Sequence, residues 1–342
     1  MATRPERSSN HRVRPSGATK VGTLEVYAIQ WLDQRTGLSP RTREIYSDQL
    51  RLHILPLVDD KVPALGKVPL AALTPELVRR WYRALADHRS PSVAAKAYVR
   101  LRQILARAVD DDRIAKNPCR IERGGVEHHP ERRFATVDQL LDLADAVPAR
   151  YRAMVLTAGL AGLRQGELFA LRRDDVDLDA GEIHVRRKRL RLASGIVIED
   201  DPKSAAGRRT VALPEPLVDE LGTHFERFVP EEDDAYVFTS SEGLPLERNN
   251  FRRRVWDPAT EKSGLDGLRF HDLRHSAGTL AARTGATTKE LMARLGHASA
   301  RAAMIYQHAT EDRDRRIADA LGEMVREASQ RDRSSENASI TR

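Results

Sequence analysis

Residues 295–308 read LGHASARAAMIYQH, which sets His297 nine positions before Tyr306. Three further segments combine glycine or histidine with basic side chains: AGLRQGEL at 161–168, PKSAAGRR at 202–209 and HDLRH at 271–275. Each segment alone is a weak signal, because a single arginine or lysine lies most often on a solvated surface. Together, and in this order along one chain, the four segments predict one functional site in the second half of the protein.

The overall charge favours a polyanionic partner. The 342 residues include 57 Lys and Arg against 50 Asp and Glu, a net charge of +7, and the isoelectric point is near 9.7. Nucleic acid is the first partner that this balance suggests and an anionic membrane surface the second, although a basic surface without a specific partner fits equally well. Cys119 is the only cysteine, which excludes an intrachain disulfide. Without a signal peptide or an apolar run of about 18 residues, the sequence predicts a cytoplasmic protein with no membrane association.

The first part of the chain divides into an arm and a helical domain. Residues 1–19 are rich in Arg, Ser and Pro, and we expect a disordered basic arm there. Within residues 20–117, three capping hydroxyls precede a proline suited to the first helical turn: Ser39-Pro40, Thr74-Pro75 and Ser90-Pro91. We predict a four- to five-helix DNA-clamping domain, although a generic helical bundle has the same pattern. The candidate DNA contacts on its basic face are Lys96, Arg100 and Arg102.

A linker and a second domain follow. Asn117-Pro118 is expected to stop the last helix, and residues 118–133 are expected to form an exposed linker. In the second domain, residues 134–328, a capping box of Thr136 and Gln139 precedes an apolar helix. Three short strands are predicted between helices, at 182–191, 196–200 and 208–213. The polar tail, residues 329–342, is expected to be disordered.

His271 and His275 have the spacing of two zinc ligands on one helical face. The metalloprotease form of this pattern has Glu directly after the first His, where this chain has Asp272. The shorter aspartate does not reproduce the general-base geometry, and no third ligand follows at a recognisable spacing. The sequence therefore disfavours a zinc hydrolase, and we expect neither a metal nor a cofactor.

Taken together, the four segments resemble the motifs of the tyrosine recombinase (phage integrase) family. That pattern is an Arg in a GLRxGE-like segment, a Lys in a strand turn, His-x-x-Arg, Leu-Gly-His and then a Tyr. No member is missing here: they are Arg164 with Glu167, Lys203, His271 with Arg274, His297 and Tyr306. The resemblance covers residues 134–320 strongly and 20–117 more weakly. It implies a mainly α fold with a small antiparallel β-sheet, in which a helical core-binding (SAM-like) domain precedes an α+β catalytic domain.

The residue types suit the cleavage of a DNA phosphodiester. Such a reaction needs a nucleophile, positive charge at the transition state and a proton for the leaving 5′-oxygen. The planar forks of Arg164 and Arg274 suit two non-bridging phosphate oxygens without a metal. A phenol, whose ordinary pKa is about 10, needs activation by positive charge and a base if Tyr306 is the nucleophile. A phosphotyrosyl ester conserves the energy of the broken bond, so no ATP is needed, and the chain has no GxxxxGK[ST] loop.

The remaining members receive supporting roles. Lys203 is the candidate general acid for the 5′-hydroxyl, His271 the proton acceptor or donor near Tyr306, and His297 a hydrogen-bond donor to the phosphate. Glu167 is expected to orient the arginine segment. Two further histidines are expected to be structural: His275 and His308. The resemblance implies a 3′-phosphotyrosine and a free 5′-hydroxyl as products, with strands exchanged in pairs through a Holliday junction within a homotetramer.

Two surface features outside the catalytic set are also predicted to interact. The strand at 182–191 is unusually basic, and we expect Lys188 to contact phosphates without reading bases. Residues 317–328 form an amphipathic pattern, and in this family a C-terminal helix docks into a neighbouring subunit; packing onto its own domain would give the same pattern.

Several activities fit such a chain. An integrase of a phage or mobile element is favoured by the segment from Val21 to Cys119, ahead of a chromosome or plasmid dimer resolvase and a transposon recombinase. A type IB topoisomerase and a non-enzymatic DNA-binding regulator are less favoured. The partner is expected to be double-stranded DNA, with an excision factor and a host DNA-bending protein as further candidates. A separate arm-binding domain is not expected, because only the short basic arm precedes residue 20.

Overall fold

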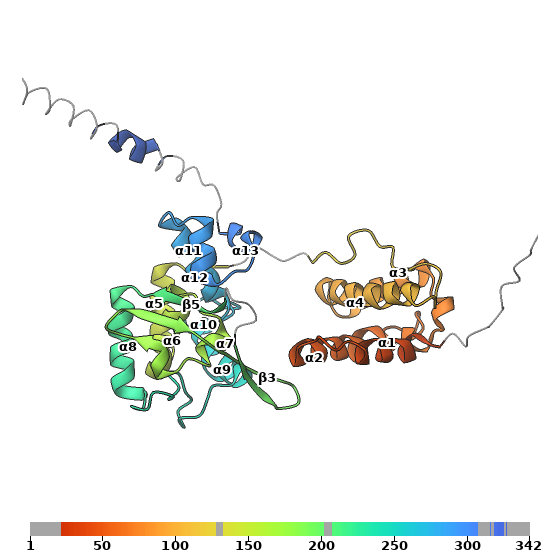
Figure 1. Ribbon diagram of the computed structural model, residues 1–342, viewed down its shortest axis with the longest axis horizontal. Helices are drawn as coiled ribbons and strands as arrows, with labels where there is room; N and C mark the ends of the chain where they lie inside the picture. The colour runs from red at the N-terminus through yellow and green to blue at the C-terminus, as the bar shows by residue number, and fades with distance from the viewer. Residues whose placement is uncertain are drawn as a thin grey trace, which may run out of the picture. The chain divides into compact units, whose positions relative to one another are not determined.

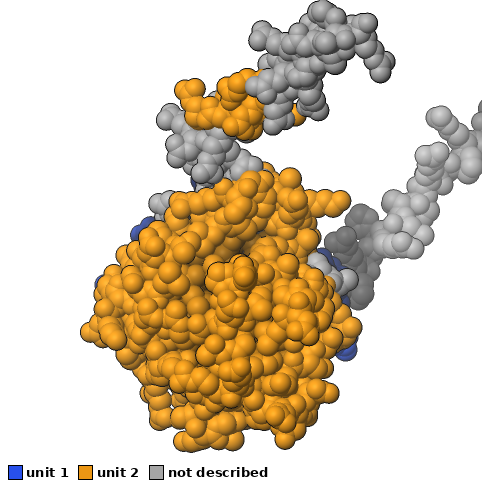
Figure 2. Space-filling view, turned by 90° about the vertical axis from the view of Figure 1, so that its left-hand side faces the viewer, with its two compact units in different colours: residues 1–130 blue, residues 131–342 orange. Residues whose placement is uncertain are grey.

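The structure is a computed structural model that describes residues 22–127, 133–201, 207–306, 315, 318–324 and 326. The chain divides into two units, residues 1–130 and 131–342 (Figures 1 and 2). The first unit is helical, and the second combines helices with two small antiparallel sheets. The predicted fold class, mainly α with a small antiparallel β component, is therefore confirmed.

The three proline-led helix starts organise the first unit. The hydroxyls of Ser39, Thr74 and Ser90 each accept a hydrogen bond from the backbone N–H three residues later, as predicted. Within residues 22–127 the α-helices are α1 (Leu24–Asp33), α2 (Pro40–Gln49), α3 (Pro75–His88) and α4 (Pro91–Asp110). Three shorter turns lie between α2 and α3: π-helical η1 (Leu50–Ile54) and the 3-10 turns η2 (Leu65–Lys67) and η3 (Leu70–Ala72).

The end of the first unit differs from the predicted linker. Helix α4 ends at Asp110, before Asn117-Pro118, and the following segment packs back onto the helix. Cys119 is buried in the core of this unit, and the backbone N–H of Ile121 donates a 2.8 Å hydrogen bond to the Tyr98 hydroxyl. The apolar Cys119 and Ile121 side chains explain this packing, because exposing them would forfeit their burial energy. Residues 128–132 lie outside the described residues.

Helix α6 (Ala149–Leu160) is the most deeply buried of the longer helices in the second unit. The other helices of this unit include α5 (Val137–Ala146), α7 (Gln165–Leu168), α8 (Glu215–Phe228), α9 (Arg248–Phe251), α10 (Asp257–Lys262), α11 (Asp272–Arg283), α12 (Thr288–Leu295) and α13 (Ala300–Met304), with the turns η4 (Arg173–Asp175) and η6 (Arg252–Trp256). Helix α5 begins with the predicted capping box. Helix α6 packs against α5, α8 and α11, so residues 153–159 are all buried. This explains why its sequence carries no clear apolar face.

The strands form two sheets, and the predicted first strand is in fact two. One sheet has the order β1 (Val176–Asp177), β2 (Glu182–Val185), β5 (Arg209–Ala212), and the other pairs β3 (Lys188–Arg191) with β4 (Val197–Asp200); both are antiparallel. The single strand predicted at 182–191 therefore breaks between Val185 and Lys188. Its first half pairs with β5 and its second half with β4. The β3–β4 hairpin extends away from the rest of the unit (Figure 1).

Candidate active site

The first part of the site is a short turn between α6 and α7. Gly162 has a positive φ of 70°, and a Cβ there would lie 2.6 Å from Leu295, so only glycine fits this turn. Arg164 follows as the N-cap of α7. The Glu167 carboxylate accepts hydrogen bonds from the backbone N–H of Arg164 and from its Nη1, both at 2.8 Å. The GLRQGE spacing thus builds a capped helix start that holds Arg164 in one conformation.

Arg209, at the start of β5, completes this part of the site. Its Nη2 lies 2.9 Å from Oε2 of Glu167, and both side chains are almost fully buried. Burial by itself raises the pKa of the Glu167 carboxyl, but the charge and hydrogen bonds of Arg209, with those of Arg164, outweigh it and hold the pKa below its ordinary value. Sequence reasoning missed Arg209. Its position six residues after Lys203 gave no indication that it would meet Glu167.

Arg274 lies on α11, next to this cluster. Its side chain is buried; Nη1 donates to the carbonyl oxygen of Gly162 at 2.6 Å, and Nη2 donates to that of Leu295. Burial, followed by the charge of Arg164, lowers the pKa of Arg274 to about 9, so its guanidinium stays protonated at pH 7. The guanidinium groups of Arg164, Arg209 and Arg274 and one carboxylate leave a net charge of 3 − 1 = +2, which favours an anion.

The Leu-Gly-His segment closes the cluster from the end of α12. Gly296 ends α12 in the left-handed conformation, with a φ of 63°, and its carbonyl oxygen accepts a 2.8 Å hydrogen bond from Nη2 of Arg164. The next residue, His297, is half-buried; burial and then the charges of Arg274 and Arg164 lower its pKa to about 4. The imidazole is therefore neutral at pH 7. Its Nδ1 is buried and has no hydrogen-bond partner among the residues that the structure describes.

Tyr306 follows α13, and its side chain lies within the same group of residues. The residue is 8% exposed, and its ring is stacked on that of His297, with centroids 6.1 Å apart and planes 11° apart. Its hydroxyl lies 2.8 Å from Nδ1 of His275. An ionised Tyr306 phenolate would raise the pKa of Arg274, so the phenol lies close enough to interact electrostatically with the arginine cluster. Helix α12 packs against both α11, which carries His275, and α13, which directly precedes Tyr306 (Figure 1).

The structure thus brings together five members of the predicted catalytic set: Arg164, Glu167, Arg274, His297 and Tyr306. His271 is the N-cap of α11, one turn before His275, and the centroids of their rings are 5.5 Å apart. It is His275, expected to be structural, that contacts the Tyr306 hydroxyl. Lys203 and His308 lie outside the described residues.

The predicted DNA contacts require one correction. Arg100 is 7% exposed and does not lie on the basic face of α4. Its guanidinium lies 3.1 Å from the ring centroid of Tyr46, and Nε donates to Gln49 at 3.0 Å, because α4 turns this side chain toward α2. Arg102 is exposed, as predicted. Lys96 pairs with Glu127 at 3.1 Å, and the Lys188 Nζ donates to the carbonyl oxygen of Asp201 at 2.8 Å.

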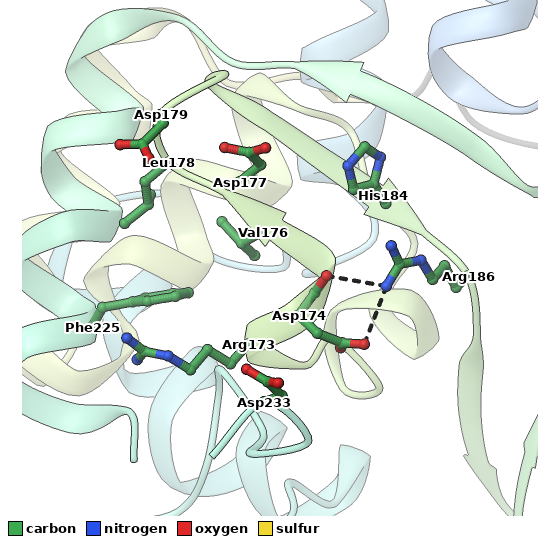
Figure 3. A pocket seen from close by; sticks show the side chains of 10 residues that line it. All are labelled: Arg173, Asp174, Val176, Asp177, Leu178, Asp179, His184, Arg186, Phe225 and Asp233. Carbon is green, nitrogen blue, oxygen red and sulfur yellow. Dashed lines mark hydrogen bonds and ion pairs between the residues drawn. The ribbon is translucent and has the colours of Figure 1, made fainter. Parts of the chain in front are cut away.

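A separate hollow of about 580 Å³ opens beside β1, β2 and α8 (Figure 3). Acidic, basic and apolar side chains all line it, and Arg186 contacts both the backbone carbonyl oxygen and the carboxylate of Asp174, at 3.0 and 3.2 Å. None of its lining residues belongs to the cluster around Tyr306. No three metal-ligating side chains in the described residues group closely enough to hold an ion.

Comparison with known proteins identifies the family. The phage integrase family model matches residues 133–313. The chain belongs to the phage integrase family. It is 39% identical over 301 residues to the prophage phiRv2 integrase of Mycobacterium tuberculosis, covering 87% of this chain and 78% of the relative. The integrase of Mycobacterium phage L5 is 34% identical over 320 residues, covering 92% and 82%.

Solved structures show the same fold. The Tn1549 transposon integrase, solved in complex with a circular intermediate DNA, superposes with a TM-score of 0.73 at 20% identity, covering 88% of this chain and 99% of that one. A lambda integrase dimer bound to a core site superposes with a TM-score of 0.63 at 20% identity, covering 84% and 99%. This member of the family is a site-specific tyrosine recombinase of the phage and mobile-element type, and so an enzyme. In the described part of the chain, no helix has the length and apolar character needed to cross a bilayer.

Proposed function

We propose that this recombinase cleaves DNA with the Tyr306 hydroxyl, which attacks a backbone phosphorus and forms a 3′-phosphotyrosyl ester as the 5′-oxygen leaves. The observation that carries the proposal is the position of the phenol, stacked on His297 and within electrostatic range of Arg274. The free 5′-hydroxyl of a second strand then attacks the ester and releases Tyr306. Each attack forms one P–O bond and breaks one, so no ATP is consumed.

Arg164 and Arg274 would bind the two non-bridging oxygens of the phosphate. The Arg274 guanidinium donates hydrogen bonds to two uncharged carbonyl oxygens, and its charge is buried, so an arriving anion would stabilise it strongly. The side chain of Arg164 is 38% exposed, so it is accessible to a substrate. Glu167, held by Arg209, orients Arg164. This arrangement supplies positive charge where the phosphorane-like transition state develops its negative charge.

The proton movements involve three further residues. His297, neutral at pH 7, donates a hydrogen bond to a phosphate oxygen. Lys203 gives a proton to the leaving 5′-oxygen. His271 is the candidate acceptor or donor of the Tyr306 proton; it lies in one ring-to-ring chain with His275 and Tyr306. No metal enters these steps.

The substrate we propose is double-stranded DNA at the attachment sites of a phage or mobile element. The chain's mycobacterial relatives are integrases, and the Tn1549 and lambda structures contain DNA. Contacts to phosphates would come from Arg102, Lys96 and Lys188. With DNA as its substrate, the enzyme is expected to work in the cytoplasm and to associate with the nucleoid. An excision factor and a host DNA-bending protein are further proposed partners.

Strand exchange is proposed to take place in a homotetramer. The described part of the C-terminal segment, residues 318–324, is helical, and Leu321 and Met324 are 57% and 65% exposed. An apolar face left open in this way is suited to dock on a neighbouring subunit. Deleting residues from Ile317 onward is expected to abolish synapsis and leave single-site binding intact.

A nicked suicide duplex tests the cleavage chemistry. The duplex carries the attachment site from the flanks of the gene, and a denaturing gel detects the covalent protein–DNA adduct in the presence of EDTA. We expect an adduct with the wild type and with Tyr236→Phe, a matched change at a partly buried tyrosine whose hydroxyl donates to Glu199, and none with Tyr306→Phe. An adduct with Tyr306→Phe would refute the proposed nucleophile. Relaxation of any supercoiled plasmid without recombinants would indicate a topoisomerase.

A further inference from the structure

The Tyr306 hydroxyl lies within hydrogen-bond distance of His275, a histidine that is not part of the family's catalytic pattern. Nδ1 of His275 lies 2.8 Å from the hydroxyl oxygen, and the contact is partly buried. His275 belongs to α11, one residue after Arg274, so the helix that carries a buried arginine of the cluster also carries this histidine. The ring centroids of His275 and Tyr306 are 5.9 Å apart and the planes are tilted by 39°, which is compatible with an in-plane hydrogen bond to the ring nitrogen.

The rest of α11 shapes the space that the phenol occupies. Gly278 lies three residues after His275, on the same side of the helix. A Cβ at Gly278 would lie 2.7 Å from Cζ of Tyr306 and 2.8 Å from Cε1, so the aromatic ring rests on bare backbone there. His297 is stacked on the ring with nearly parallel planes. Contacts with Gly278 and His297 thus hold the ring, and His275 meets its hydroxyl.

We propose that His275 is a positioning residue for the nucleophile: its Nδ1 accepts the hydrogen bond of the Tyr306 hydroxyl and holds the oxygen in the orientation from which it attacks DNA. The proposal rests on Tyr306 being the nucleophile. With Nδ1 as the acceptor, the imidazole carries its hydrogen on Nε2. The hydroxyl then directs its proton toward His275, and its lone pairs remain available to a phosphorus atom. Without this hydrogen bond the hydroxyl would be held less firmly in that orientation, and fewer encounters would start from the reactive geometry.

The electrostatic surroundings agree with a neutral acceptor. The charged groups of the site are the guanidinium groups of Arg164, Arg209 and Arg274 and the carboxylate of Glu167. The neighbouring rings are those of His271 and His297. A neutral imidazole adds no further positive charge to this group and still offers a lone pair to the hydroxyl.

The test compares His275→Ala with His275→Asn in the full chain. The Oδ1 of asparagine can occupy the place of Nδ1 and accept the same hydrogen bond, but it is not a base. DNA affinity is measured by gel shift and adduct formation by single-turnover kinetics on the suicide duplex. We expect His275→Ala to slow adduct formation by about 10- to 100-fold with an unchanged dissociation constant, the size of one lost hydrogen bond at a reacting group. His275→Asn should recover most of that loss.

A matched control and a second readout separate this inference from the proposed function. His184→Ala removes a histidine on β2 of the same unit, whose Nδ1 contacts the Thr210 hydroxyl on β5, and it should leave the rate unchanged. In the DNA-free protein, the ¹³Cζ resonance of Tyr306, assigned by its loss in Tyr306→Phe, should shift in His275→Ala and much less in His275→Asn. This measurement holds even if the wild type forms no adduct, an outcome that would refute the proposed function alone.

Three results would overturn the inference. The first is equal cleavage rates for the wild type and His275→Ala. The second is an equal loss in His275→Asn and His275→Ala with intact DNA binding, which would mean that His275 takes the proton itself. The third is an unchanged Tyr306 resonance in His275→Ala, which would show that the hydrogen bond does not form in solution.

Discussion

Replacing Glu167 by Gln tests whether the buried carboxylate holds the arginine cluster together. The change keeps the size of the side chain and removes its charge. Glu167 accepts hydrogen bonds from the backbone and guanidinium of Arg164 and from the guanidinium of Arg209. An amide offers one acceptor oxygen, and its NH₂ group would face these donors. Arg209, whose side chain is only 5% exposed, would then be a buried cation without its counter-ion.

The expected loss follows from the cost of leaving one partner of a buried ion pair unmatched, about 3–5 kcal/mol. We expect the lower end, about 3 kcal/mol, because glutamine keeps one acceptor oxygen. For a unit of the size of residues 131–342, this corresponds to a fall in Tm of about 6–12 °C. The pKa of Glu167 is lowered in the folded protein, so its stabilisation is complete above the ordinary pKa of 4.5. It is lost as the pH falls through the folded value, and the two proteins should converge in acid.

The assay is urea unfolding of the full chain at pH 7, with a double-mutant cycle. Glu220→Gln is the matched control, because Glu220 pairs with Arg152 at 3.0 Å but is partly exposed, and it should cost less than about 1 kcal/mol. Glu167→Gln with Arg209→Met should cost at least about 1.5 kcal/mol less than the sum of the single changes. Additive losses, or a loss for Glu167→Gln no larger than that of the control, would refute the argument.

Four further predictions concern His297, Arg100, Arg102 and Gly159. Folding lowers the pKa of His297 from 6.5 to about 4, so the unfolded chain binds a proton at this residue at a higher pH than the folded chain does. The free energy of unfolding should therefore decrease as the pH is lowered from 6.5 to 4. His297→Asn should reduce that decrease in urea titrations. Arg100→Met should destabilise the first unit by about 1–3 kcal/mol in thermal unfolding. Arg102→Ala should leave that stability unchanged and instead lower the salt dependence of DNA binding by about one unit of slope. Gly159→Ala should cost about 1–3 kcal/mol, because its Cβ would lie 2.4 Å from Leu140; an unchanged Tm would contradict this packing.

Local signals predicted the helix starts well. The hydroxyl–proline pairs at Ser39, Thr74 and Ser90 and the capping box at Thr136 satisfy backbone groups within a few residues, so their outcome depends little on the rest of the chain. The strand at 182–191 was less predictable. Its residue pattern predicts an extended strand, but it does not predict that the two halves of the strand pair with different partners.

The exposure of charged side chains was harder to predict. Arg100 and Arg102 both occur on α4 among basic residues, and we predicted both to be exposed, although Arg100 stands three residues after the buried Ala97 and four before the buried Ile104. The aromatic ring of Tyr46, on another helix, turns Arg100 into a buried residue and leaves Arg102 on the surface. Such long-range packing overrides local patterns because burial energy depends on the neighbour that a side chain finds.

The sequence by itself determined the family and the chemical set, because the order and spacing of Arg164, His271, Arg274, His297 and Tyr306 are local facts of one chain. Only the tertiary structure decided which side chains meet. It paired Glu167 with Arg209 across the fold and brought the Tyr306 hydroxyl to His275. Both contacts join residues more than 30 positions apart, and hydrogen bonds of 2.8–2.9 Å depend on packing that no spacing rule records.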